Sequence, residues 1–408
     1  MDTTTDAPTP ETTEEATASP FDGETDMAAN PQPIFKALRD NSPVLAMEGS
    51  LVLSRKTDID EALRHPEMFT SNMSAVDLKN VRPLIPLQID PPDHKKFRKL
   101  LDPIFAPRFM TAMEEEVAVL VNDLIDRFIE RGEVDFSAEF STPYPSQVFL
   151  TLLGLPLNEL PRFLEMKDGI IRPDHVTGSP YGSKKADAHQ QEVADSIYAY
   201  FNQVLDEREQ APRADLVSRF LSAEVDGHQL TREDILDICF LFLIAGLDTV
   251  SATLDCMFSF LSQHPEHRQQ LVDDPSLIPS AIEELLRWET PVQMVARAAL
   301  EDGAFAGCPV KKGDNIVLML GSANTDDLEV EDAQEVRFDR EVNRHIAFGG
   351  GIHRCLGSHL ARMELRVALR EWHRRIPEYS VEPGHTLVYT PNIRSIERFP
   401  MRFTAKEQ

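Results

Sequence analysis

The sequence predicts a mainly α-helical fold with small β-sheets, an α+β architecture. Residues 231–263 contain no proline, and apolar side chains surround this stretch almost all the way round between positions 238 and 247. This pattern is typical of a helix that crosses a protein core. Residues 358–375 repeat apolar side chains at helical spacing, whereas strand-like composition is confined to short runs such as 50–54 and 315–320.

Composition indicates one large domain behind an acidic tail. Residues 1–26 carry acidic side chains, Thr and Pro but no Lys or Arg, so this tail is predicted to be disordered and is not a signal peptide. No linker interrupts residues 27–408, which are therefore predicted to form a single domain. With 42% hydrophobic residues, the chain has ample material for a core.

Charge and cysteine content exclude some classes of protein. The net charge of −27 argues against nucleic acid as a partner, because phosphate backbones are bound by an excess of Lys and Arg. Acidity by itself also serves solubility. The four cysteines, Cys239, Cys256, Cys308 and Cys355, are too few and too scattered for a disulfide framework, and they fit a reducing cytoplasm.

The remaining elements follow from pattern and punctuation. A strand is expected at 50–54, a helix begins near Asp90, and helices are expected at 34–40, 57–64, 112–131, 140–155 and 193–208. Residues 172–182, rich in Pro and Gly, are interpreted as a flexible lid or simply as a connecting loop. Thr231 to Asp234 resembles a capping box, and residues 303–320 indicate a hairpin whose last strand is 315–320.

A lone cysteine lies between a glycine-rich loop and the predicted helix 358–375. Cys355 would thus stand at a helix N-terminus, where free N–H groups and the helix dipole favour a thiolate. Gly351 and Gly357 remove side chains where a flat cofactor would lie against the backbone. Such a thiolate is a soft ligand for a metal centre with an open position. The other interpretation is a buried structural cysteine at a glycine turn.

The pattern Phe348-x-x-Gly351-x-His353-x-Cys355-x-Gly357 resembles the haem-ligand loop of the cytochrome P450 family. The resemblance covers about residues 30–405. It implies that family's fold, with haem between a long central helix and the loop that carries the Cys ligand. It also implies haem b as the cofactor, O2 as co-substrate and no metal other than the haem iron. The absence of a C-x-x-C-H motif indicates a haem without thioether bonds.

Two further motifs stand in the family's order. Ala245-Gly246-Leu247-Asp248-Thr249 resembles the oxygen-activating segment, in which Asp248 and Thr249 would be catalytic and pass protons to bound oxygen. Taken alone, these residues are better explained by a Thr that bonds its own i−4 carbonyl and an Asp paired with an Arg, and the presence of Cys355 reverses this preference. Glu284-Leu285-Leu286-Arg287 resembles the family's buried ion pair, which steadies the ligand loop.

The resemblance also assigns contacts to the cofactor. His94 and Arg98 share a helical face and could grip one carboxylate, as in the family's propionate-binding pair, and Arg297 matches a second such position. The predicted cofactor-binding set is His94, Arg98, Ala245, Gly246, Arg297, Phe348, Gly349, His353 and Gly357. Residues 324–327, Asn-Thr-Asp-Asp, depart from the family's usual Asn-Arg-Asp-Pro.

Apolar side chains near these motifs are the candidates for a substrate pocket. They are Met73, Val76, Leu84, Ile85, Ile244, Leu247, Val292, Met294, Val295, Ile393 and Ile396. For the residues of the irregular stretch 69–88, packing onto the body of the fold is an equally good interpretation.

The resemblance implies a cytoplasmic haem-thiolate monooxygenase of the soluble bacterial class, monomeric and without a membrane anchor. It would hydroxylate a small lipophilic substrate, most simply a terpenoid, with two electrons from an iron–sulfur ferredoxin and its NAD(P)H-dependent reductase. Lys95, Lys96 and Lys99 form a basic patch that suits an acidic ferredoxin, or are merely a solvated helix face. The alternatives are an H2O2-driven peroxygenase, a fatty-acid or steroid hydroxylase, and a non-catalytic haem-binding sensor.

Overall fold

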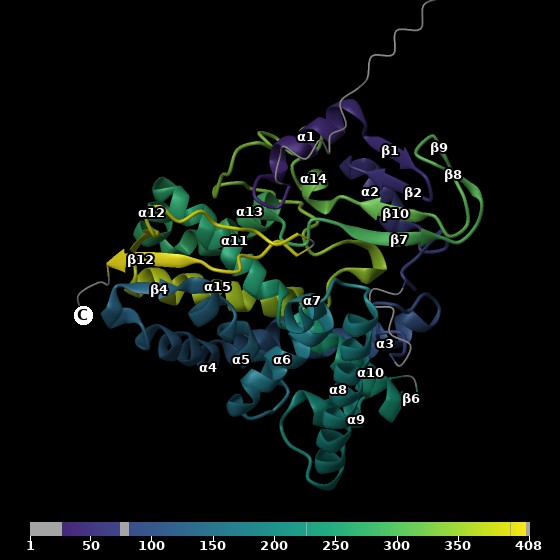
Figure 1. The fold of residues 1–408 in the computed structure, drawn as a ribbon, viewed down its shortest axis with the longest axis horizontal. Coiled ribbons are helices and arrows are strands. Elements are labelled where there is room, and N and C mark those ends of the chain that lie inside the picture. The colour runs from purple at the N-terminus through teal and green to yellow at the C-terminus, as the bar shows by residue number, and fades with distance from the viewer. Residues whose placement is uncertain (1–26, 74–80, 226, 392, 405–408) are drawn as a thin grey trace, which may run out of the picture.

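The structure is a computed structural model that describes residues 27–73, 81–225, 227–391 and 393–404. The predicted acidic tail, residues 1–26, and the pocket candidate Val76 lie outside the described residues. Figure 1 shows a β-rich part that contains α1, β1, β2, β7 and β10, and a larger helical part below it. The predicted architecture, mainly α with small sheets, is confirmed.

Helices make up most of the described chain, and several begin with the signals expected from sequence. Their bounds are α1 Pro31–Asn41, α2 Lys56–Arg64, α3 Asp93–Leu101, α4 Pro107–Asp126, α5 Pro143–Leu152, α6 Leu160–Ile171, α7 Pro173–Thr177, α8 Lys184–Gln210, α9 Leu216–Ser222, α10 Arg232–Gly246, α11 Thr249–Gln263, α12 Pro265–Asp273, α13 Ile278–Glu289, α14 Leu320–Asn324 and α15 Ser358–Arg375. The capping box at Thr231 and Asp234 is present, since each side chain bonds the other's backbone N–H. The last long helix, 358–375, has the predicted bounds.

The largest sheet has the strand order β1-β2-β10-β7-β3. Its strands are β1 Val44–Met47, β2 Ser50–Leu53, β3 Phe69–Thr70, β7 Val295–Ala299 and β10 Asn315–Leu318. The other strands are β4 Glu133–Asp135, β5 Glu224–Val225, β6 His228–Gln229, β8 Gly303–Phe305, β9 Cys308–Val310, β11 Glu378–Val381 and β12 Pro400–Thr404. Among these, β11-β12-β4 form a three-stranded sheet, and β5 with β6 and β8 with β9 form two-stranded ones.

The predicted hairpin over residues 303–320 is wrong in its pairing. The hairpin closes within β8 and β9, around Gly307 at φ +79°. The strand β10 instead pairs parallel with β2 and antiparallel with β7. Ile316 of β10 is fully buried. This burial favours pairing of β10 inside the five-stranded sheet over pairing with the exposed hairpin.

The predicted single helix over residues 231–263 is broken. The helix α10 ends at Gly246 and α11 begins at Thr249. Around the break, Thr249 Oγ1 donates to the carbonyl of Ala245 at 3.0 Å and Ser251 Oγ donates to that of Leu247 at 3.1 Å. Hydroxyls that compete for i−4 carbonyls bend helices, which explains why absence of proline did not make this helix continuous.

Three hydrophobic clusters form the core, and the broken helix connects two of them. The buried residues of α11 pack in a cluster with α4 and α15, whereas those of α10 pack with α5, α6 and α8. The third cluster lies between α1, α2 and the largest sheet. By length and composition Arg232–Gln263 could cross a membrane, but 72% of its most apolar window is buried inside the protein, as in a core helix.

Between α6 and α8, the predicted loop over residues 172–182 contains the short helix α7, Pro173–Thr177. It is closed by Gly178 at φ +64°, a conformation that glycine adopts without strain. This segment is thus not simply irregular.

Candidate functional site

The loop before α15 holds Cys355 in place by backbone geometry. Gly349 and Gly351 have φ of +67° and +61°, values that favour glycine. The Cys355 N–H donates to the carbonyl of Phe348 at 2.9 Å, which closes the loop on itself. Ser358, three residues later, begins α15, so Cys355 lies near the helix N-terminus as predicted.

The Cys355 side chain is exposed by surface area and yet enclosed by protein atoms. Burial raises the pKa of its thiol, and this effect outweighs the Gly357 N–H and the cation Arg98, which both lower it. The Gly357 N–H thus acts in the direction predicted for this end of the helix, although burial has the larger effect on the free thiol.

The two glycines predicted to make room for a cofactor differ from each other. A Cβ at Gly351 would lie 2.2 Å from the carbonyl oxygen of Leu63, so this glycine is required by packing against α2. At Gly357 nothing lies within 4 Å of that position, and the space is open. Space for a flat cofactor was predicted at both glycines, but only Gly357 has it.

The break between α10 and α11 opens part of an otherwise buried helix. Ala245 is exposed, although Leu243 and Leu247 on either side are completely buried. Gly246 does not face this opening, because a Cβ there would lie 3.2 Å from the ring of Phe149 on α5. The small residue that gives access at this helix is therefore Ala245, and Gly246 serves the packing of α5.

Asp248 is buried and carries two ion pairs. Its carboxylate lies 3.1 Å from Lys167 Nζ on α6 and 2.8 Å from the guanidinium of Arg172, at the end of that helix. Asp168 lies 3.1 Å from each of the same two cations. Together with the Thr249 bond to Ala245, these are the contacts of the plainer interpretation, in which Asp248 pairs with an Arg. They fix both side chains at the break.

Four basic side chains were predicted to bind haem carboxylates, and two of them, His94 and His353, are in contact. The rings of His94 and His353 lie 4.4 Å apart, and the Nε2 atoms of both are buried without a hydrogen-bond partner among the described residues. Burial, with smaller effects of His94 and Arg297, lowers the pKa of His353 to about 3. Arg98 instead donates to the Arg354 carbonyl at 2.8 Å and pairs with Asp102 at 2.8 Å.

These observations fit a haem. Unpartnered imidazole nitrogens at His94 and His353 and the half-buried Arg297 suit propionate carboxylates. Cys355 offers an exposed sulfur ligand, and the space beside Gly357 is open. In the described ranges, no cluster of His, Cys, Asp and Glu suits another metal.

The ion pair of Glu284 and Arg287 is present and fully buried. Two parallel bonds of 2.8 Å join them, and Arg287 also donates to the carbonyls of Asn324 and Ala333. Burial would raise the pKa of Glu284, but the bond and charge of Arg287 outweigh it and lower that pKa. The pair therefore ties α13 to the segments after α14, as the resemblance implied.

The segment 324–327 that departs from the family pattern is nevertheless well anchored. Asn324 accepts from the Ile346 N–H at 2.7 Å, which leads directly into the Cys355 loop. Thr325, in place of Arg, accepts from Arg39, and Asp327, in place of Pro, lies 3.6 Å from Nε of the same arginine. The two residues that depart from the family pattern thus have partners in the first part of the chain.

The pocket candidates divide by burial. The half-buried ones are Met73, Ile244, Val292, Met294, Val295 and Ile393. In contrast, Leu84, Ile85 and Leu247 are buried in the cluster around α10, and Ile396 is buried in the cluster around α11. Those four pack as core residues, the interpretation that the sequence left open for Leu84 and Ile85.

Three residues near the site were not recognised from the sequence. Lys167 reaches Asp248 across 81 positions, and Gln88 holds the candidate-bearing loop by bonds to Leu84 N and the Met73 carbonyl. Glu283, beside the recognised Glu284, binds Arg362 of α15 at 2.6 Å. Only the last had a visible cue, an acid adjacent to a motif.

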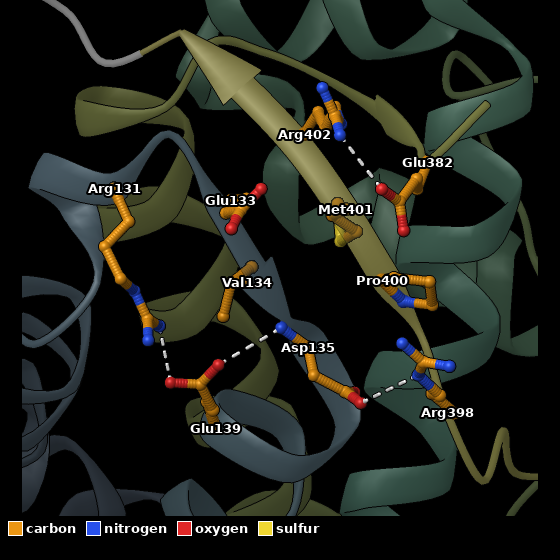
Figure 2. Close-up of a pocket in the computed structure, with 10 residues that line it drawn as sticks. All are labelled: Arg131, Glu133, Val134, Asp135, Glu139, Glu382, Arg398, Pro400, Met401 and Arg402. Atoms are coloured by element: carbon orange, nitrogen blue, oxygen red, sulfur yellow. Dashed lines mark hydrogen bonds and ion pairs between the residues drawn. The ribbon is translucent and has the colours of Figure 1, made fainter.

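A surface hollow between β4 and β12 lies apart from all predicted site residues. Figure 2 shows charged side chains around it, with Arg131 bonded to Glu139 at 2.5 Å and Arg402 to Glu382 at 3.0 Å. Arg398 lies 3.9 Å from Asp135, so each of the three cations that line the hollow has a carboxylate partner.

Known proteins resemble this chain along most of its length. The family model described as Cytochrome P450 matches residues 42–385. A probable cytochrome P450 127A1 of Sinorhizobium fredii is 34% identical over 82% of this chain and 79% of its own length. The mycinamicin IV hydroxylase/epoxidase of Micromonospora griseorubida is 31% identical over 81% of this chain and 78% of its own.

Solved structures agree with these relatives. CYP109E1 from Bacillus megaterium in complex with testosterone has a TM-score of 0.81 at 29% identity, covering 91% of this chain and 99% of its own. P450BioI in complex with an acyl carrier protein ligated to hexadec-9Z-enoic acid has a TM-score of 0.83 at 27% identity, covering 92% and 98%.

Proposed function

This chain belongs to the cytochrome P450 family and is a monooxygenase, and on that premise we propose that Cys355 is the thiolate ligand of its haem. The observation that carries this assignment is the accessible sulfur of Cys355 on its glycine-rich loop. Beside it, His353 of the same loop and His94 of α3 have buried Nε2 atoms without a hydrogen-bond partner among the described residues. His94, His353 and Arg297 would hold the propionates. Phe348, Gly349, Gly357 and Ala245 would border the porphyrin.

When bound, the haem supplies O2 activation, and a thiolate ligand favours O–O cleavage. The protein's part is to hold protons and substrate. Asp248 would take up protons from water next to Arg172, whose side chain is 23% exposed. Thr249 would pass a proton on by accepting it at a free lone pair of Oγ1 and releasing its own hydroxyl hydrogen, which otherwise bonds the Ala245 carbonyl.

We propose a small lipophilic substrate, with a terpenoid as the first class to test. The half-buried candidates Met73, Ile244, Val292, Met294 and Ile393 are all apolar. The printed names of relatives and neighbours include a mycinamicin hydroxylase, a testosterone complex and a hexadecenoyl carrier complex. A steroid or a fatty acid is therefore the second class.

We propose that electrons come from an acidic ferredoxin that docks beside α3, in the cytoplasm. Lys95, Lys96 and Lys99 are exposed on this helix. Arg98 of the same helix touches the carbonyl of Arg354, which precedes the ligand Cys355. Opposite charge at this surface would speed the encounter. A peroxygenase would need neither this patch nor Asp248 and Thr249.

The carbon monoxide complex of the reduced protein tests the ligand. The wild-type protein is expected to show the family's diagnostic violet band, and Cys355→Ala is expected to abolish it. The control Cys308→Ala changes a half-buried cysteine on β9 and should leave the band unchanged. A protein that takes up no haem, or one with histidine as the proximal ligand, would overturn the assignment.

A panel of lipophiles tests the substrate class. Terpenoids are expected to shift the haem spin state by displacing water from iron, and steroids and fatty acids are the comparison arms. If no lipophile shifts it, a haem-binding sensor is favoured instead.

A further inference from the structure

A second ion-pair cluster lies beside the ligand loop and is distinct from the Glu284 pair. Glu283 of α13 accepts two parallel bonds from Arg362 of α15, at 2.6 Å from Nε and 2.7 Å from Nη2. The same carboxylate lies 2.9 Å from Nε2 of His345. Because a bidentate pair is fixed in direction, this contact orients the guanidinium of Arg362.

The oriented guanidinium lies against the ligand loop. Its carbon is 4.5 Å from the centre of the Phe348 ring, which is the geometry of a cation–π contact. The carbonyl of Phe348 in turn accepts the hydrogen bond from the Cys355 N–H at 2.9 Å. A continuous series of contacts therefore runs from Glu283 through Arg362 and Phe348 to Cys355.

Charge follows the same route. The guanidinium of Arg362 carries a positive charge, and its contact with the Phe348 ring brings that charge beside the loop that holds Cys355. Burial would raise the pKa of Glu283, but hydrogen bonds from Arg362 and His345 bring it down to about 2. Glu283 is thus a carboxylate at neutral pH and opposes the field of Arg362.

We propose that Glu283 and Arg362 are positioning residues that set the charge at the Cys355 sulfur. Arg362 holds the Phe348 ring and places a positive charge near the Cys355 sulfur. The negative charge of Glu283 partly cancels that positive charge at the sulfur. This inference rests on the proposed function, because it requires Cys355 to be the ligand of iron.

The proposal predicts opposite effects for the two partners. A positive charge near the haem favours the state with one more electron. Removing the carboxylate by Glu283→Gln should raise the reduction potential, and removing the cation by Arg362→Gln should lower it. Each shift is expected to be about tenfold in the equilibrium constant, or about 59 mV for one electron. The double variant should lie close to wild type.

The chain offers a matched control on the same helix. Arg366, four residues after Arg362, pairs with Glu114 of α4, and both side chains of that pair are half-buried. Within the described residues, Arg366 makes no ring contact with the ligand loop. Glu114→Gln should therefore leave the potential unchanged, although it too breaks an interhelical pair.

The measurement is a redox titration of the haem-loaded protein, with the carbon monoxide band as a check on thiolate ligation. Failure of the wild type to show that band would defeat the proposed function, whereas variants that keep the band test this inference alone. Shifts in the same direction, no shift, or an equal shift in Glu114→Gln would overturn it. If Glu283→Gln loses the band, Arg362→Lys decides, because it keeps the charge: a potential near wild type supports the proposal, and one as low as in Arg362→Gln overturns it.

Discussion

At the scale of single residues, one hydroxyl has a structural use and a proposed chemical one. Thr249 Oγ1 donates to the Ala245 carbonyl where the core helix breaks, and its position matches the family's oxygen-activating threonine. Thr253, one turn later, donates to the Thr249 carbonyl at 2.7 Å in the same way, but it is buried in the helix. Comparing the two separates helix bonding from proton delivery.

We expect Thr249→Ala to uncouple O2 consumption from product formation, with product per O2 falling on the order of tenfold. The reason is that bound oxygen loses its nearest hydroxyl donor. The measurement compares NAD(P)H or O2 consumed with product formed. Thr253→Ala loses an equivalent helix bond and should stay coupled; unchanged coupling in Thr249→Ala would count against the relay.

A buried histidine gives the protein a pH-dependent stability. Burial lowers the pKa of His373 from 6.5 to about 4, while its Nδ1 lies 2.7 Å from the Leu369 carbonyl. Between these pH values the unfolded chain binds more protons than the folded one. The contribution of His373 is therefore complete above pH 6.5 and is lost as the pH falls toward 4, up to about 3 kcal/mol.

His373→Phe should flatten this part of the pH profile. The free energy of unfolding, measured by urea denaturation from pH 7 to pH 4, is expected to fall less steeply than in wild type. His175→Asn, at a side chain that is 55% exposed, should keep the wild-type slope. Equal slopes in His373→Phe and wild type would show that His373 is not the group responsible.

At the scale of elements, α13 is the hub that connects the ligand loop to the rest of the fold. Its Glu284 accepts bonds from Arg287, from the Arg337 N–H and from Arg340. Its Glu283 holds α15 through Arg362. Adjacent acids on one helix thus serve separate contacts, one to the segment after α14 and one to the helix that follows Cys355.

We expect Arg287→Met to lower the free energy of unfolding by about 3 to 5 kcal/mol, because it leaves a buried carboxylate without its bidentate partner. The comparison is Arg402→Met on β12, whose pair with Glu382 is exposed and should be worth less than about 1 kcal/mol. Urea denaturation of the haem-loaded protein measures both. Similar costs for the two variants would contradict the assignment of Arg287 as a structural anchor.

At the scale of the whole molecule, the Cys355 loop is pinned between two of the three hydrophobic clusters. On one side it leads into α15, whose apolar residues belong to the cluster around α11. On the other side Gly351 packs against the Leu63 carbonyl of α2, which belongs to the cluster around the largest sheet. The ligand loop thus connects the β-rich and helical parts seen in Figure 1.

Gly351→Ala should disturb this connection. Its Cβ would lie 2.2 Å from the Leu63 oxygen, in addition to the strain of a positive φ. We expect a loss of stability of about 1 to 3 kcal/mol beyond the φ cost, together with weaker haem retention. Gly349→Ala has a similar φ of +67° but open space around it, so it isolates the φ cost of about 1 to 2 kcal/mol. Equal effects in unfolding and haem-transfer assays would argue against the packing role.

The sequence by itself determined the family and the mainly helical architecture, and it predicted the ligand loop. Local rules were sufficient there: the bounds of α15, the capping box at Thr231 and the glycines around Cys355 depend on residues within a few positions of one another. The ion pair of Glu284 and Arg287 is also local, since one helical turn joins its members.

Only the tertiary structure decided the rest, because those contacts join residues far apart in the chain. Asp248 meets Lys167 across 81 positions, Gly351 owes its role to Leu63, and β10 leaves its hairpin to pair with β2. The break between α10 and α11 falls where one helix passes from one hydrophobic cluster to another. The hydroxyls of Thr249 and Ser251 give the sequence a local cause for a bend, but which clusters meet at the break depends on what packs around the helix.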